Sequence, residues 1–239
     1  MIPLKDYNPA RSFPYVSILL IVLNVTLFAV DRITGHIVLM SYETARGVVT
    51  TYQYVGGLTQ QYAVVPDRAA SDLLSWVTIF TSMFLHGNLL HIASNMLYLW
   101  IFGNNVEDVL GRFKFLMFYF TCGFFAAMTQ ILSNPESTIP MVGASGAIAG
   151  VMGAYLILFP RAKILTLVPI FFFFTFFELP ALVTIGYWAL IQFVNASWLE
   201  GGGMRGGGVA YYAHIGGFAT GLVWIIASGL RKRVKMYWA

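Results

Sequence analysis

A serine and a histidine in separate apolar runs are the pair in this sequence whose chemistry is most suggestive. Ser145 stands between small residues in Gly143-Ala144-Ser145-Gly146, at the head of an apolar run that continues to Phe159. His214 stands at the head of another apolar run. A serine hydroxyl is a weak nucleophile until a base removes its proton, and an imidazole can be that base and later the acid for the leaving amine. The pair therefore indicates acyl transfer, in the form of peptide-bond hydrolysis.

Three polar residues at the start of a third apolar run can support the same chemistry. His91 and Asn95 are four residues apart and so share one face of a helix, whereas His86 stands just ahead of the regular helix. The tetrahedral intermediate of acyl transfer needs donors aimed at its oxyanion. The candidate donors are the side chains of His91 and Asn95 and the backbone N–H of Ser145, which lies at a helix N-terminus.

The carboxylates nearest to these runs are expected to be structural. Glu107 follows the second apolar run on the side opposite the serine, where we expect it to cap a turn over 103–111. Glu178 stands two residues before Pro180 and is expected to start a helix. The predicted catalytic unit is therefore a Ser145–His214 dyad without a carboxylate.

The composition indicates that lipid surrounds most of the chain. Of its 239 residues, 58% are hydrophobic and 10% are charged, whereas soluble domains carry about 25% charged residues. A hydrocarbon core of about 30 Å needs about 20 apolar residues per helix. We predict an all-α polytopic membrane protein, one domain over 1–239 with a long interfacial first loop and with spans at about 15–31, 86–103, 113–132, 143–159, 179–198 and 212–230.

Two segments between the spans are harder to interpret. Residues 31–75 are too polar to span a membrane and too apolar for a free coil, which favours a folded loop at the membrane interface. Residues 164–177 are apolar but few, and Pro169 interrupts them, so they either lie at the interface or enter the membrane. We favour the interface, followed by one span rather than two.

Basic residues predict the orientation. With six spans, most Lys and Arg residues fall on one side of the membrane, and the exceptions are Arg32, Arg46, Arg68 and Arg205. Because cytoplasmic loops are enriched in Lys and Arg, both termini are expected in the cytoplasm. Spans two, four and six then enter from the outer side, which places His91, Ser145 and His214 at similar depth near the outer face.

Small residues in two of these spans predict a close helix crossing. Gly146 and Gly150 form a small-xxx-small pair in the fourth span, and Gly217 and Gly221 form one in the sixth. Such pairs let two backbones approach closely. Because the serine and the histidine stand just ahead of these pairs, the crossing is expected to bring them within hydrogen-bond distance.

Other functions fit these residues less well. A metal site of His86, His91 and His214 is not expected, because their spacing differs from the helical zinc motif and neither Cys nor Glu joins them. We expect no cofactor and no nucleic-acid partner. The alternative to a protease is a non-proteolytic membrane chaperone or transporter that uses the same polar cluster, although a transporter more often shows internal repeats.

The motifs together resemble those of the rhomboid family of intramembrane serine proteases, of bacterial type. The resemblance covers about 75–230 and rests on His86-x4-His91-x3-Asn95, Gly143-x-Ser145-Gly146, Ala213-His214-Ile215-Gly216-Gly217 and the turn from Phe102 to Gly111. It implies Ser145 as nucleophile, His214 as base, His91 and Asn95 as oxyanion donors, and His86 as support for the hydration and hydrogen bonding of the site.

The resemblance also implies a setting and partners. The expected substrates are membrane proteins with a transmembrane segment that unwinds easily, cut near the outer face of a bacterial inner membrane. Residues 31–75 would be the half-submerged first loop of the family, and span five its lateral gate. Residues 200–208, which include Met204, would be its mobile cap. The oligomeric state and the natural substrate are not implied.

Two positions depart from the family pattern. A Trp-Arg pair in the first loop is replaced by Val77 and Thr78, with Trp76 nearby. An aromatic residue one turn after the serine, which stacks on the base, is replaced by Ala149. Another group must therefore orient the histidine, and the candidates are Tyr211, Tyr212 and Tyr155.

Overall fold

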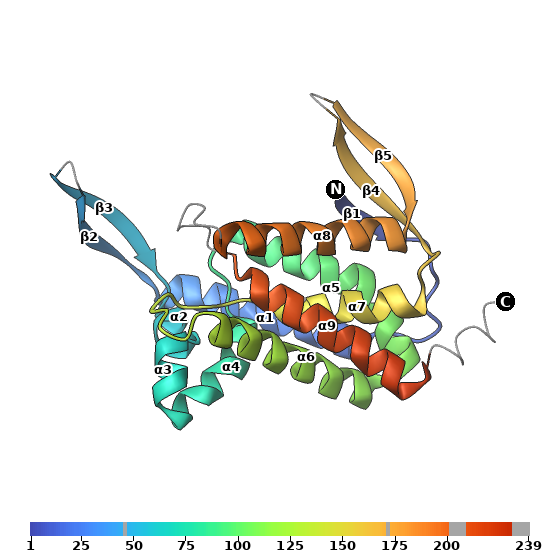
Figure 1. Ribbon diagram of the computed structural model, residues 1–239, viewed down its shortest axis with the longest axis horizontal. Coiled ribbons are helices and arrows are strands. Elements are labelled where there is room, and N and C mark those ends of the chain that lie inside the picture. The colour runs from blue at the N-terminus through green and yellow to red at the C-terminus, as the bar shows by residue number, and fades with distance from the viewer. Residues whose placement is uncertain (45–46, 171–172, 201–208, 231–239) are drawn as a thin grey trace.

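The computed structural model describes residues 1–44, 47–170, 173–200 and 209–230. The body of this part of the chain is a bundle of long helices lying side by side (Figure 1), namely α1 (Tyr15–Thr34), α5 (Leu89–Leu110), α6 (Arg112–Ser133), α7 (Ser145–Leu158), α8 (Ala181–Glu200) and α9 (Tyr211–Ser228). Each helix coincides with one of the predicted spans, and the largest difference is that α5 continues to Leu110 through the expected turn. The hydropathy pattern therefore located the helices of the bundle.

Helix α7 is the centre of the bundle. It has 14 residues, which at 1.5 Å per residue gives a length of about 21 Å. Nearly all of its residues are buried, and α5, α6, α8 and α9 pack around it. Because half of its residues are Gly, Ala or Val, neighbouring helices can approach it closely.

Glycines bring α7 and α9 into backbone contact. A β-carbon on Gly217 would overlap the carbonyl oxygen of Gly146, and one on Gly221 would overlap that of Gly150. This is the crossing that the two small-residue pairs predict. It places the first turns of α7 and α9 side by side at one end of the bundle.

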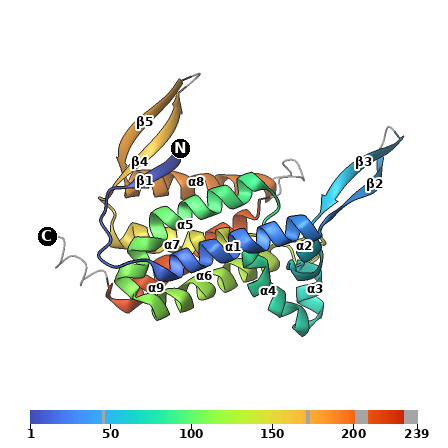
Figure 2. The same ribbon diagram turned by 180° about the vertical axis from the view of Figure 1, so that it is seen from behind.

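The bundle carries a β-sheet at each end, so the prediction of an all-α fold is wrong in this respect (Figures 1 and 2). At the end where α1 finishes, β2 (His36–Thr44) and β3 (Gly47–Val55) form an antiparallel hairpin. Short helices follow, namely α2 (Gly57–Tyr62), α3 (Pro66–Ser71), η1 (Leu73–Trp76), α4 (Val77–Thr81) and η2 (Ser82–Phe84). Segment 31–75 is thus folded, and its β-branched and aromatic residues favour strands over helix.

The second sheet contains the segment that the sequence left open. Strands β1 (Ile2–Asp6), β4 (Lys163–Ile170) and β5 (Phe173–Pro180) form an antiparallel sheet in the order β1-β4-β5. The described residues of 164–177 therefore lie in two paired strands, with the amino-terminal strand added to the edge. Glu178 lies in β5, where its carboxylate is 3.1 Å from the Lys163 ammonium, so the expectation that it starts a helix is wrong.

The last turn of α5 anchors the amino-terminal segment, and Glu107 makes its main contact. The buried Glu107 carboxylate accepts hydrogen bonds from the backbone N–H groups of Val16 (2.9 Å) and Ser17 (2.8 Å) and from the Ser17 hydroxyl (2.8 Å). It caps the first turn of α1 and not its own turn, which corrects the expectation. Because these polar groups are paired, α5 can stay helical and buried up to Leu110.

The outward faces of the helices are apolar. Leu19 on α1, Leu190 on α8 and Val223 on α9 are each about 60% exposed, at 61%, 60% and 64%. Among the described residues, α1 and α6 are long and apolar enough to cross a membrane. Asn95 and Gln192 are polar and buried inside the bundle. An apolar exterior of this extent is typical of surfaces that contact lipid or protein partners.

Candidate active site

The serine and the histidine that the sequence singles out lie in direct contact. Ser145 is the first residue of α7, and His214 lies in the first turn of α9. The hydroxyl Oγ of Ser145 is 2.8 Å from Nε2 of His214. The contact depends on the glycine crossing that begins just beyond it, at Gly146 on α7 and Gly217 on α9, so the chain order of the spans and the small residues together position the pair.

Gly143 forms the floor of the site next to the serine. Its φ of +125° lies in a region that side chains rarely adopt, and its N–H donates to the carbonyl of Ser82 at 2.9 Å. A β-carbon at Gly143 would lie 2.8 Å from Nε2 of His91 and 3.7 Å from Nδ2 of Asn95. The structure therefore brings both predicted oxyanion donors to the backbone two residues before Ser145.

Helix α5 holds these two donors at its first turns. The Asn88 side chain caps α5 by accepting from the N–H of His91 at 2.8 Å. The Nδ2 group of Asn95 is buried and makes no hydrogen bond within the described part of the chain. A buried amide with an open donor next to the serine is a group that can bind a ligand oxygen.

His86 lies behind His91 rather than beside the serine. Its side chain is fully buried, and its ring meets that of His91 edge to face with centroids 5.0 Å apart. Neither ring nitrogen of His86 has a hydrogen-bond partner among the described residues. His86 therefore supports the position of His91 by packing.

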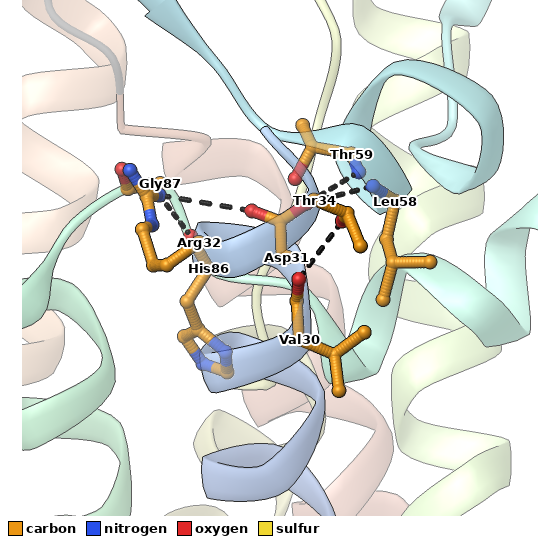
Figure 3. A network of polar contacts seen from close by, with 8 residues as sticks. All are labelled: Val30, Asp31, Arg32, Thr34, Leu58, Thr59, His86 and Gly87. Carbon is orange, nitrogen blue, oxygen red and sulfur yellow. Dashed lines mark hydrogen bonds and ion pairs between the residues drawn. The ribbon is translucent and has the colours of Figure 1, made fainter. Parts of the chain in front are cut away.

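The end of α1 fixes the segment that carries His86 (Figure 3). The Arg32 guanidinium donates to the carbonyls of His86 (3.1 Å) and Gly87 (2.7 Å). Its neighbour Asp31 is buried and accepts from the N–H groups of Leu58 and Thr59 at the start of α2. These bonds tie the first loop and the approach to α5 to the same helix end.

Trp76 contributes a further anchor to the first loop, in which the Trp-Arg pair of the family is missing. Its indole N–H donates to the carbonyl of Ala69 at 2.9 Å. Val77 is 64% exposed. The Trp76 ring also lies with its centroid 6.3 Å from that of Phe124 on α6. This contact and those of Asp31 and Arg32 connect the loop to the bundle without that pair.

Sequence reasoning missed the residues that contact the other side of His214. Nδ1 of His214 is 2.8 Å from Oε1 of Gln192, and the Trp188 ring lies with its centroid 5.7 Å from that of the imidazole. Both residues are on α8 and are four apart, so they share a face. Tyr155 is wrong as a candidate, since it packs against Phe102 with ring centroids 5.1 Å apart. The available signal was the glutamine itself, one of two side-chain amides in an otherwise apolar span.

Two cavities adjoin the Ser145–His214 pair. The larger, about 400 Å³, lies between α8 and α9, with His214 and Gln192 in its wall among apolar residues such as Phe193, Phe218 and Leu222. The smaller, about 40 Å³, adjoins Ser145 and is lined mainly by small and apolar residues. The described residues contain no group of three or more His, Cys, Asp or Glu that could hold a metal ion.

Some expected features fall outside the described residues. They are the glycine-rich cap with Met204, over 201–208, and the basic tail from Arg231.

Comparison with known proteins links the chain to one family. Residues 74–231, well over half of the chain, match the Rhomboid domain. Rhomboid protein 1, mitochondrial, of Saccharomyces cerevisiae is 32% identical over 165 residues, which cover 66% of this chain and 44% of that protein. Rhomboid protease GluP of Bacillus subtilis is 34% identical over 105 residues, which cover 42% of this chain and 20% of that protein. The chain thus spans less than half the length of these relatives.

Proposed function

Since the chain belongs to the rhomboid family, whose members are integral membrane proteins, we propose that it is an intramembrane serine endopeptidase. Ser145 is the nucleophile and His214 the general base. The observation that carries the proposal is the 2.8 Å contact between Oγ of Ser145 and Nε2 of His214, made by two helices that begin at the same end of the bundle.

The reaction follows from that contact. The Ser145 oxygen attacks the carbonyl carbon of the scissile bond as Nε2 of His214 takes the hydroxyl proton. The same nitrogen returns the proton to the departing amine, which leaves an acyl-enzyme. Water, deprotonated by His214, then attacks the ester and releases the second product. The dyad does this without a carboxylate.

The negative charge of each tetrahedral intermediate needs donors, and three converge on one place. The N–H of Ser145 lies at the start of α7, where the helix dipole favours an anion. Nε2 of His91 and Nδ2 of Asn95 face the backbone at Gly143. Removing one donor of this kind costs about 2.7–4 kcal/mol of transition-state stabilisation in other serine proteases.

We propose membrane-anchored proteins as substrates, cut near the outer face of the membrane. The apolar exterior of the helices and the loop charges support an inner-membrane location with cytoplasmic termini. The cavity of about 40 Å³ at Ser145 suits a small side chain next to the scissile bond. A substrate segment that unwinds easily exposes such a bond at lower cost.

A labelling experiment tests the proposal without knowledge of the substrate. The detergent-solubilised protein is incubated with a fluorescent fluorophosphonate, and wild type is compared with Ser145→Ala, His214→Ala and Ser197→Ala. Within the described ranges, the Ser197 hydroxyl on α8 bonds the carbonyl of Phe193 alone, at 3.0 Å, so this variant should label like wild type. The other two should lose labelling and also cleavage of a membrane-anchored reporter. Labelling and cleavage that persist in Ser145→Ala would refute Ser145 as the nucleophile. A wild type that neither labels nor cleaves would favour a non-proteolytic chaperone or transporter.

A further inference from the structure

Helix α8 presents one amide to the side of His214 that faces away from the serine. We propose that Gln192 is a positioning residue for the catalytic histidine and completes a hydrogen-bonded chain of Ser145, His214 and Gln192. The inference rests on the proposed function and extends it, because the dyad alone leaves the second ring nitrogen of the histidine unassigned.

Hydrogen bonds fix which way the Gln192 amide points. One end of the amide is 3.3 Å from the carbonyl oxygen of Trp188, and the other is 2.8 Å from Nδ1 of His214. A carbonyl can only accept, so the NH₂ group must face Trp188 and the oxygen must face the imidazole. Nδ1 therefore carries the ring proton, and Nε2 is left as an acceptor for the Ser145 hydroxyl. Gln192 thus selects the tautomer that a general base requires.

The surroundings of the imidazole make this acceptor important. Phe193, Phe218 and Leu222 line the cavity beside His214, and none of their side chains can accept a hydrogen bond. During catalysis the imidazole becomes an imidazolium with two N–H donors. One serves the reacting atoms, and the other would face apolar side chains if Gln192 were absent, which is costly for a charged group.

A neutral amide suits this place better than a carboxylate. Gln192 is buried on a helix whose neighbouring residues are apolar, so a permanent charge there would lack a partner in the resting enzyme. The amide accepts the Nδ1 proton at no such cost. The Trp188 ring, on the same face of α8, packs near the imidazole at 38° to its plane and restricts its rotation.

Comparing the activities of two substitutions at Gln192 shows whether this residue acts as a hydrogen-bond acceptor or only fills space. Gln192→Met keeps the length of the side chain and packs well against the apolar residues of the cavity, but it loses the oxygen acceptor. Gln192→Glu keeps an oxygen acceptor but packs less well against these apolar residues. The measurement is kcat and KM for reporter cleavage, together with the rate constant of fluorophosphonate labelling. We expect Gln192→Met to lower kcat and the labelling rate constant by about 10- to 100-fold, with KM within about twofold of the wild-type value. Gln192→Glu should keep kcat within about fivefold of wild type. A tenfold change in rate corresponds to about 1.36 kcal/mol.

Asn195→Leu is the matched control, an amide lost one turn away on the same helix, and should behave like wild type. A Gln192→Met variant that keeps more than half of the wild-type kcat, or that exceeds Gln192→Glu, would overturn the role of Gln192. That result leaves the proposed function standing, since the wild type still labels at Ser145. Absence of labelling and cleavage in wild type itself would instead be the failure of the proposed function.

Discussion

The buried carboxylate of Glu107 joins the last turn of α5 to the start of α1, and replacing it should destabilise the whole bundle. Glu107→Ala leaves three donors without an acceptor, namely two first-turn N–H groups and the Ser17 hydroxyl. A buried donor left unsatisfied costs about 1–3 kcal/mol, and loss of a helix cap costs about 0.5–2 kcal/mol. Water can enter the space left by the side chain and satisfy part of these groups. We therefore expect the free energy of unfolding to fall by about 3–5 kcal/mol, the range found when one partner of a buried ion pair is removed.

The adjacent acid supplies the control. Asp108 is also a carboxylate of this turn and accepts from the N–H of Arg11 at 3.0 Å and from the Ser12 hydroxyl, but these contacts are exposed. Exposed contacts of charged groups contribute about 0–1 kcal/mol. Asp108→Ala should therefore change stability far less than Glu107→Ala, although the change in net charge is the same.

The single cysteine makes the assay simple. Cys122 is the one cysteine of the chain and is 0% exposed within α6, so a thiol-reactive fluorogenic maleimide reports its exposure on heating in detergent. For a chain of this size, 1 kcal/mol corresponds to about 2–4 °C in Tm, so Glu107→Ala should melt about 6–20 °C below wild type. A Tm within about 2 °C of wild type, or an equal drop in Asp108→Ala, would refute the reasoning.

Two further predictions concern the helix crossing and the amino-terminal sheet. Gly217→Ala should push α9 away from the Gly146 carbonyl and lower kcat for reporter cleavage at least tenfold. Gly186→Ala is the control and should leave reporter cleavage unchanged, because a β-carbon there meets nothing within 4 Å. Equal activity of both variants would contradict the crossing geometry. Burial raises the pKa of Asp6 in β1 from 3.8 to about 6, so the folded state holds this proton more tightly than the unfolded chain. Its contribution to stability is present below pH 4 and is lost as pH rises through 6. Asp6→Asn should remove this loss of stability between pH 4.5 and pH 7, measured as the difference in Tm from circular-dichroism melts at the two pH values. The same difference in Tm in the variant and in wild type would contradict this role of Asp6.

Hydropathy alone located the helices because a membrane helix must be apolar along its whole length, which is a local property of the sequence. Strands were missed for the same reason, since an apolar run of the length of residues 164–170 is compatible with either structure. Only the pairing of β4 with β5 and with the distant β1 satisfies its backbone groups as a sheet. The extension of α5 to Leu110 likewise depends on contacts with residues about 90 positions away.

The candidate site divides in the same way. The order of the spans, the positions of Ser145 and His214 at their starts, and the glycine pairs behind them were enough to predict that the two side chains meet. The partner on the far side of the imidazole was not predictable, because spacing tells which residues share a face of α8 but not which face turns toward α9. That rotation is set by how α8 packs on the rest of the bundle, and it alone places Gln192, rather than a tyrosine, against Nδ1.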